Sequence, residues 1–185
     1  MQQGIESNHT LEKINKIEGT VFWIVDLFTF EASMISRLNQ KLPGKDIIMI
    51  LTKRDVLPST LSDEKILAFV QDRLKEEGIQ VKEILICGYL LKHDEESTRN
   101  LSRIVTAIQK YRRGKDVIFM GVANAGKSTI LNRLMASKDL TISRNPGTTL
   151  DLVPLVQEDY TIYDSPGIEN KHSILTILQP KDLKP

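Results

Sequence analysis

A short loop in the second half of the chain limits the possible folds more than any other feature. Residues 121–129 read GVANAGKST and match the phosphate-loop pattern Gly-x-x-x-x-Gly-Lys-Ser/Thr. The apolar run DVIFM leads into this loop, and the helix-forming series STILNRLM leads out of it. Such a strand–loop–helix unit normally opens a domain, yet here most of the chain precedes it. Either a truncated second domain begins here, or the parts of one domain stand in a different order.

The rest of the chain favours one domain with a rearranged order. Apolar runs rich in β-branched and aromatic residues alternate with amphipathic stretches, which predicts an α/β fold with a mostly parallel sheet and helices on both faces. Strands are expected at 20–28, 46–52, 81–87, 116–121, 150–156 and 160–164, and the turn at Glu158-Asp159 can join the last two as a hairpin. Helices are expected at about 31–41, 62–77, 96–112 and 127–137.

Within the second of these helices, one stripe is expected to be buried, and Ser62 is expected to cap the start. The stripe consists of Ile66, Phe69, Val70, Arg73 and Leu74.

No flexible linker divides these elements. The segment RRGKD (112–116) is short, as a helix-to-strand connection inside one domain usually is. We therefore expect a single domain over residues 17–185, preceded by a polar N-terminal linker over residues 1–16.

Composition excludes several classes of protein. The formal net charge is +1, so no overall basic field points to nucleic acid. The single cysteine permits neither an internal disulfide nor an all-cysteine zinc site, and the three histidines show no metal-ligand spacing. No signal peptide and no membrane-spanning run is found, which predicts a cytoplasmic protein; we expect it to be a monomer.

The phosphate loop has a defined chemistry. Gly121 and Gly126 let the backbone curl so that the N–H groups of the loop point at phosphate oxygens. Lys127 neutralises phosphate charge, and the Ser128 hydroxyl can bind Mg²⁺. The other residues expected to contact nucleotide here are Asn124, Ala125 and Thr129. The competing interpretation is a glycine turn that binds nothing.

Two further loops complete a phosphate and metal site. DSPG (164–167) follows a predicted strand, so Asp164 can hold Mg²⁺ through water and the Gly167 N–H can meet the γ-phosphate. RNPGTTLD (144–151) offers Thr148 and Thr149 as a second metal ligand, and Thr149 is the one assigned here. Each segment alone is also a good generic turn, and only its position relative to the phosphate loop favours function.

A motif that precedes the phosphate loop in the chain indicates which base the nucleotide carries. TKRD (52–55) ends a predicted strand and resembles the Asn-Lys-x-Asp motif of GTP-binding proteins. In such a motif Asp55 accepts two hydrogen bonds from guanine, and Lys53 lays its aliphatic stem over the base. One βα unit later, Cys87-Gly88 stand where these proteins carry Ser-Ala, whose backbone faces the guanine O6.

Taken cyclically, the motifs follow the order of a Ras-like GTPase cut after its DSPG loop. The chain resembles the circularly permuted GTPases, in particular the YqeH group of ribosome-assembly factors. The resemblance implies a three-layer P-loop NTPase fold that binds GTP and GDP with Mg²⁺ and hydrolyses GTP, with Lys127, Thr149 and Gly167 as catalytic residues. It also implies a role in assembly of the small ribosomal subunit, through domains that are not in this sequence. The alternative is a nucleotide-dependent module that docks to RNA or protein and hydrolyses little GTP.

The sequence departs from this family at several positions. Thr52 replaces the usual Asn, which is expected to weaken the tie between the base motif and the phosphate loop. Ile168 follows DSPG where Ras-type enzymes have a water-orienting Gln, so slow turnover is expected. Asn124 resembles a ligand of potassium-stimulated GTPases, which adds K⁺ as a candidate cofactor. Asp26 is given only a tentative role, because Thr29 stands where the family has a second acidic residue.

Overall fold

The computed structural model describes residues 2–88, 90, 94–122, 125–136, 143–144 and 152–166. Seven strands in this part of the chain form one sheet in the order β3-β2-β1-β4-β7-β6-β5. The strands are β1 (Gly19–Asp26), β2 (Ile47–Thr52), β3 (Glu83–Ile86), β4 (Asp116–Gly121), β5 (Ser143–Arg144), β6 (Val153–Val156) and β7 (Thr161–Asp164). Strands β3, β2, β1, β4 and β7 run parallel, and β6 and β5 extend the sheet in antiparallel pairs.

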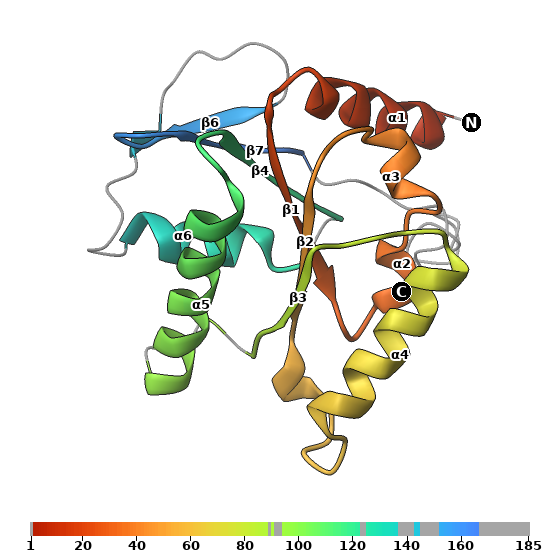
Figure 1. Ribbon diagram of the computed structural model, residues 1–185. Coiled ribbons are helices and arrows are strands. Elements are labelled where there is room, and N and C mark those ends of the chain that lie inside the picture. Colours follow the sequence, from red (N-terminus) through yellow and green to blue (C-terminus); the bar gives the residue numbers. More distant parts are fainter. Residues whose placement is uncertain are drawn as a thin grey trace, which may run out of the picture.

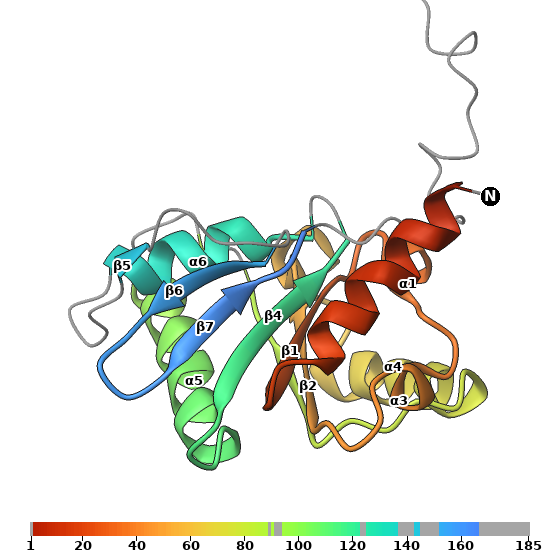
Figure 2. The same ribbon diagram turned by 90° about the horizontal axis from the view of Figure 1, so that it is seen from above.

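Helices cover both faces of this sheet, which gives three layers (Figures 1 and 2). One face carries α1 (Gln2–Asn15), α2 (Phe30–Ser33), α3 (Leu38–Lys41) and α4 (Asp63–Glu76). The other face carries α5 (Glu95–Tyr111) and α6 (Lys127–Ala136). The predicted α/β architecture with helices on both faces is confirmed.

The central strands are continuous apolar runs because both of their faces are buried. Every residue of β1 and of β2 is buried. In β1, Val21, Trp23 and Val25 pack toward the α1–α4 side, and Phe22 and Ile24 pack toward α5 and α6. Alternate side chains point to opposite faces of a strand, so an uninterrupted apolar run is what a fully covered parallel sheet requires.

The parallel strands place their carboxyl ends at one edge of the sheet. The chain moves outward from β1 to β2 and β3, and then crosses through α5 to β4 on the other side of β1. The strand order therefore reverses between β1 and β4. In open α/β sheets ligands bind outside the carboxyl ends of the strands at such a point.

Helices α4, α5 and α6 form where the sequence predicts them. In α4 the Ser62 side chain accepts the Lys65 N–H, as expected of the cap. The buried stripe is narrower than expected: Ile66, Val70 and Leu74 are buried, whereas Phe69 is 53% exposed. Arg73 also departs from the stripe, because its guanidinium pairs with Glu31, Glu76 and Glu77.

The prediction of a single helix at 31–41 is wrong. Two short helices, α2 and α3, occupy this stretch, and the backbone between them leaves the helical region. Arg37 has a φ of 53° and donates its N–H to the Glu77 carbonyl at 2.8 Å. This contact with the end of α4 fixes a break that helical periodicity alone does not reveal.

The N-terminal segment differs from the expected polar linker. It includes α1, whose residues Leu11 and Ile14 are 3% and 0% exposed and belong to the core on the α1–α4 side. The C-terminal part of this segment therefore contributes to the core of the fold.

The predicted hairpin near the end of the described chain is present. Strands β6 and β7 pair antiparallel, with Val156 opposite Thr161, and the Gln157 N–H binds the Tyr160 carbonyl at 2.9 Å. The hairpin adds β7 directly beside the phosphate-loop strand β4.

Candidate functional site

Four of the predicted motifs lie at the carboxyl edge of the parallel sheet, whereas residues 145–151 of RNPGTTLD lie outside the described residues. The phosphate loop follows β4 and DSPG follows β7. TKRD overlaps the end of β2, and Cys87-Gly88 follow β3. Four motifs that are distant in sequence thus converge on one edge.

Two positions of the phosphate loop require glycine, one because of a close backbone contact and one because of its backbone conformation. A Cβ at Gly121 would lie 2.9 Å from the Ile24 carbonyl oxygen of the neighbouring strand, closer than real Cβ contacts come. Gly126 has a φ of 99°, which side chains other than glycine rarely adopt. Its carbonyl accepts the Ile130 N–H, so α6 starts directly at the loop. Ser128 and Thr129 lie in the first turn of this helix.

The Lys127 ammonium faces the DSPG loop. It binds Asp164 Oδ1 and the Ser165 carbonyl oxygen. Ser165 is itself anchored, because its hydroxyl donates to the Phe119 carbonyl of β4 at 2.7 Å. The predicted phosphate residue Lys127 and the predicted metal residue Asp164 are therefore in direct contact in the structure.

Thr52 joins the base motif to the phosphate loop. The buried Thr52 hydroxyl donates to the Ala125 carbonyl at 2.6 Å, and it lies 3.4 Å from the Val25 carbonyl. Its side chain also packs against Gly126, where an added Cβ would lie 3.5 Å from the Thr52 methyl carbon. The base motif and the phosphate loop are thus tied directly by a hydroxyl, and the expected weakening relative to Asn stays a prediction.

The base loops also contact each other. The Arg54 N–H donates to the Cys87 carbonyl at 3.2 Å. A Cβ added at Gly88 would lie 4.0 Å from Asp55 Oδ1, so the exposed Asp55 carboxylate stands beside the Cys87-Gly88 loop. Lys53 adopts a φ of 64°, an uncommon conformation outside glycine, at the point where the chain leaves β2.

Cys87 is structural at this site. Its side chain is fully buried, and its N–H binds the Leu51 carbonyl at 2.8 Å. Burial raises the pKa of the Cys87 thiol to about 11. The N–H and the carbonyl of Cys87 both bind protein groups, so the contact of this loop with guanine stays a prediction.

Three predicted site residues lie outside the described residues. These are Asn124, Thr149 and Gly167. Their roles as potassium ligand, magnesium ligand and γ-phosphate contact therefore stay predictions.

Asp26 is the residue that sequence reasoning undervalued. It ends β1 and is 2% exposed. Its Oδ2 lies 2.6 Å from the Lys53 ammonium nitrogen, and its Oδ1 accepts the Phe28 N–H at 2.8 Å. The sequence signal for Asp26 is a carboxylate at the end of an apolar strand, but its partner Lys53 is identified only from the structure.

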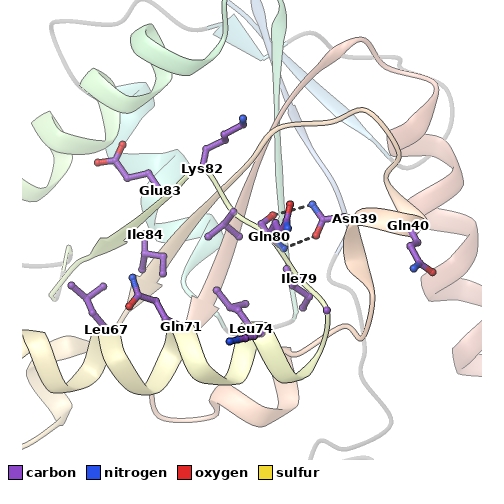
Figure 3. Close-up of a pocket in the computed structure, with 13 residues that line it drawn as sticks. Asn39, Gln40, Leu67, Gln71, Leu74, Ile79, Gln80, Lys82, Glu83 and Ile84 are labelled. Atoms are coloured by element: carbon purple, nitrogen blue, oxygen red, sulfur yellow. Dashed lines mark hydrogen bonds between the residues drawn. The ribbon is translucent and has the colours of Figure 1, made fainter.

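A hollow of about 880 Å³ lies away from these motifs (Figure 3). It is bounded by Leu67, Gln71 and Leu74 of α4 and by the segment 78–84 that leads into β3. Asn39 closes one end through paired hydrogen bonds with the Gln80 backbone, at 2.9 and 2.7 Å. None of the described motif residues lines it.

The fold and site define a class of protein. A phosphate loop on the central strand, a carboxylate loop on the adjacent strand and a base motif across the switch point make a P-loop nucleotide-binding domain. The base motif precedes the phosphate loop in the chain, so this domain is circularly permuted.

Comparison with known proteins agrees with this class. The model of the family described as "50S ribosome-binding GTPase" matches residues 116–182. The Bacillus subtilis protein YqeH, described as uncharacterized, is 32% identical over 94% of this chain and 48% of that protein. NO-associated protein 1 of Arabidopsis thaliana is 25% identical over 98% of this chain and 35% of its own length.

Two more distant similarities were also found. GTPase Der of Francisella tularensis is 25% identical over 86% of this chain and 36% of that protein. A solved structure described as the GDP-bound form of TM YlqF is 21% identical, covers 88% of this chain and 59% of that one, and superposes with a TM-score of 0.49.

The chain is a homologue of YqeH, and its residues 116–182 match a GTPase domain family. It spans less than half of the length of the relatives YqeH, NO-associated protein 1 and Der.

Proposed function

We propose that this chain binds guanine nucleotides at the carboxyl edge of the sheet and hydrolyses GTP there. The observation that carries the proposal is the 2.6 Å hydrogen bond from Thr52 to the Ala125 carbonyl. It ties the strand that bears the base motif to the loop that bears the phosphate motif, so one nucleotide can span both.

Base recognition falls to the loops after β2 and β3. The exposed Asp55 carboxylate is available to accept hydrogen bonds from the ring N–H and the exocyclic amine of guanine. Adenine offers no such pair of donors on that edge. The Gly88 backbone lies beside Asp55, and we propose that it faces the guanine O6.

Phosphate binding requires Lys127 to exchange partners. In the structure its ammonium binds Asp164 and the Ser165 carbonyl. The β- and γ-phosphates carry more negative charge than one carboxylate and offer several oxygens, so they compete for this ammonium. Release of Asp164 from Lys127 then leaves its carboxylate available to a metal.

The residues present fit Mg²⁺. Ser128 is exposed in the first turn of α6, and the Asp164 carboxylate, whose side chain is 23% exposed, stands at the end of β7. Within the described residues no cluster of three His, Cys, Asp or Glu could hold a metal ion. Mg²⁺ suits such a site because it is usually bound through one or two protein oxygens together with phosphates and water. When bound, it would neutralise charge that develops on the phosphates.

Hydrolysis would proceed by in-line attack of water on the γ-phosphate, with Lys127 stabilising the transition-state charge. Thr149 and Gly167 are proposed to complete the contacts around the γ-phosphate. Ile168 follows where related enzymes orient water with Gln, so intrinsic turnover is slow. A K⁺ ion at Asn124 is proposed to supply part of the missing charge.

We further propose a role in ribosome assembly, in the cytoplasm and as a monomer. The resemblance to the YqeH group indicates the small subunit, whereas the matched family description names the 50S subunit. The second candidate function, a docking module with little hydrolysis, has the same nucleotide site but a different output. None of the helices in the described part of the chain combines the length and apolar character needed to cross a membrane.

The test is phosphate release from GTP and from ATP in Mg²⁺, with K⁺ or Na⁺, and with each ribosomal subunit added in turn. Hydrolysis of GTP alone, faster in K⁺ and stimulated by one subunit, is the expected result. The Lys127→Ala variant should lose most nucleotide affinity and all turnover. Tight GTP binding without turnover under every condition would favour the docking module, and equal turnover of ATP would contradict the assignment of the base.

A further inference from the structure

The pair formed by Asp26 and Lys53 joins two loops of the nucleotide site. Asp26 comes from the end of β1 and Lys53 from the end of the adjacent strand β2. The two side chains meet at 2.6 Å, where the Asp26 side chain is 3% exposed and the Lys53 side chain is 34% exposed. A buried carboxylate is costly without a partner, so the Lys53 ammonium stabilises the charged form of Asp26.

The backbone around Lys53 restrains the same position. Lys53 keeps its left-handed conformation while its carbonyl accepts the Val56 N–H and the Leu27 N–H binds the Thr52 carbonyl. The ammonium is directed to the buried Asp26 carboxylate, whereas about a third of the Lys53 side chain (34%) stays exposed. When the ammonium of a lysine is fixed by an ion pair, its methylene groups form an apolar surface in a fixed position.

We propose that Asp26 is a positioning residue for the base of the nucleotide. By holding the ammonium, it fixes the Lys53 stem in the place where a purine ring would lie. This inference rests on the proposed function, since it assumes that a purine nucleotide occupies this edge. It adds a residue outside the TKRD motif to the machinery of base binding.

A structural role for Asp26 is the competing explanation. Its Oδ1 accepts the Phe28 N–H and could simply shape the loop after β1. The substitution Asp26→Asn separates the two roles, because the amide oxygen can still accept from Phe28 while the negative charge is lost. Lys53→Met removes the ammonium and keeps an unbranched apolar side chain.

The experiment is a double-mutant cycle read by equilibrium titration with GDP labelled on its ribose by a methylanthraniloyl group. Asp26→Asn and Lys53→Met are each expected to raise the Kd for GDP about tenfold. The Kd of the double variant should exceed that of the more weakly binding single variant by no more than about twofold. Such coupling means that the two residues act as one unit. Effects that multiply, or an unchanged Kd in Asp26→Asn, would overturn the proposal.

Asp46→Asn is the matched control. Asp46 directly precedes β2, at the end of the strand opposite to Lys53 and the base motif. Its carboxylate lies 3.9 Å from the Lys82 ammonium. Its Kd for GDP should equal that of the unmodified protein. Circular dichroism and thermal unfolding establish that each variant is folded.

If Asp26→Asn does not fold, the comparison of Lys53→Met with Lys53→Ala decides the matter. An anchored stem predicts that Lys53→Met loses nearly as much GDP affinity as Lys53→Ala, whereas full affinity in Lys53→Met overturns the proposal. Failure of the proposed function looks different: the unmodified protein would then bind ADP as well as GDP, and the cycle, run with ADP, still tests the anchor. A protein that binds no purine nucleotide contradicts both.

Discussion

Thr52 carries the tie between the base motif and the phosphate loop through one hydroxyl. Thr52→Val keeps the shape of the side chain but leaves the Ala125 carbonyl without its 2.6 Å partner. We expect the free energy of unfolding to fall by about 1–2 kcal/mol and GDP affinity to fall with it. Urea unfolding and GDP titration measure the two effects. The exposed Thr60→Val is the control, and a Thr52→Val protein as stable and as tight as the unmodified one would contradict the tie.

Cys87 should make the protein sensitive to alkaline pH. Burial raises the pKa of its thiol from 9.0 to about 11, so between these values the folded state keeps a proton that the unfolded state loses. Stability from this group is complete below pH 9 and is lost as the pH rises to 11, on the order of 2 kcal/mol in total. Urea unfolding from pH 8 to pH 11 should show a steeper loss than in Cys87→Ala. Parallel pH profiles for the two proteins would refute the assignment.

The motif residues could be predicted from the sequence because their spacing carries the chemistry. Lys127, Asp164 and Asp55 each lie in a short pattern at the end of a strand, and the structure places them at the same edge of the sheet. The partner of Asp26 could not be predicted, since Lys53 lies on another strand and only the strand order brings the two together. For the same reason the acceptor of the Thr52 hydroxyl could not be predicted, since Ala125 is far away in the chain.

Helix α4 depends on its cap at the start. The Ser62 side chain accepts the Lys65 N–H at 3.3 Å, and Asp63 and Glu64 follow in the first turn. Ser62→Ala should lower the free energy of unfolding by about 1 kcal/mol, as the loss of an N-cap usually does. The exposed Ser59→Ala, in the preceding turn, should have little effect. Equal unfolding midpoints for the two variants would show that the cap contributes nothing.

Elements with strong periodicity were predictable, and elements shaped by distant contacts were not. Helix α5 and strand β4 appear almost at the expected residues, because their apolar patterns are long and bounded by turns. The region 31–41 breaks into α2 and α3 because the Arg37 backbone binds the end of α4. Phe69 lies on the exposed part of α4. Its ring packs against that of Phe30, with the two ring centroids 5.7 Å apart, instead of entering the core.

The whole molecule accommodates the permutation through one tight connection. Between α5 and β4, the Lys115 N–H binds the Arg112 carbonyl at 2.8 Å, and Arg113 and Gly114 both have positive φ. This turn joins what would be the two ends of an unpermuted domain. Chain ends of a compact domain often lie close together, so the rearrangement leaves the core and the order of strands around the site intact.

The central claim is that the permuted chain still reads guanine through Asp55. Competition against methylanthraniloyl-GDP at equilibrium tests it most directly, with GDP, ADP and xanthosine diphosphate as competitors. GDP should displace the label from the unmodified protein at far lower concentration than ADP. Asp55→Asn should shift the preference from GDP toward xanthosine diphosphate, whose ring carbonyl needs a donor. Displacement by ADP as efficient as by GDP, or an Asp55→Asn protein that still prefers GDP, would contradict the account.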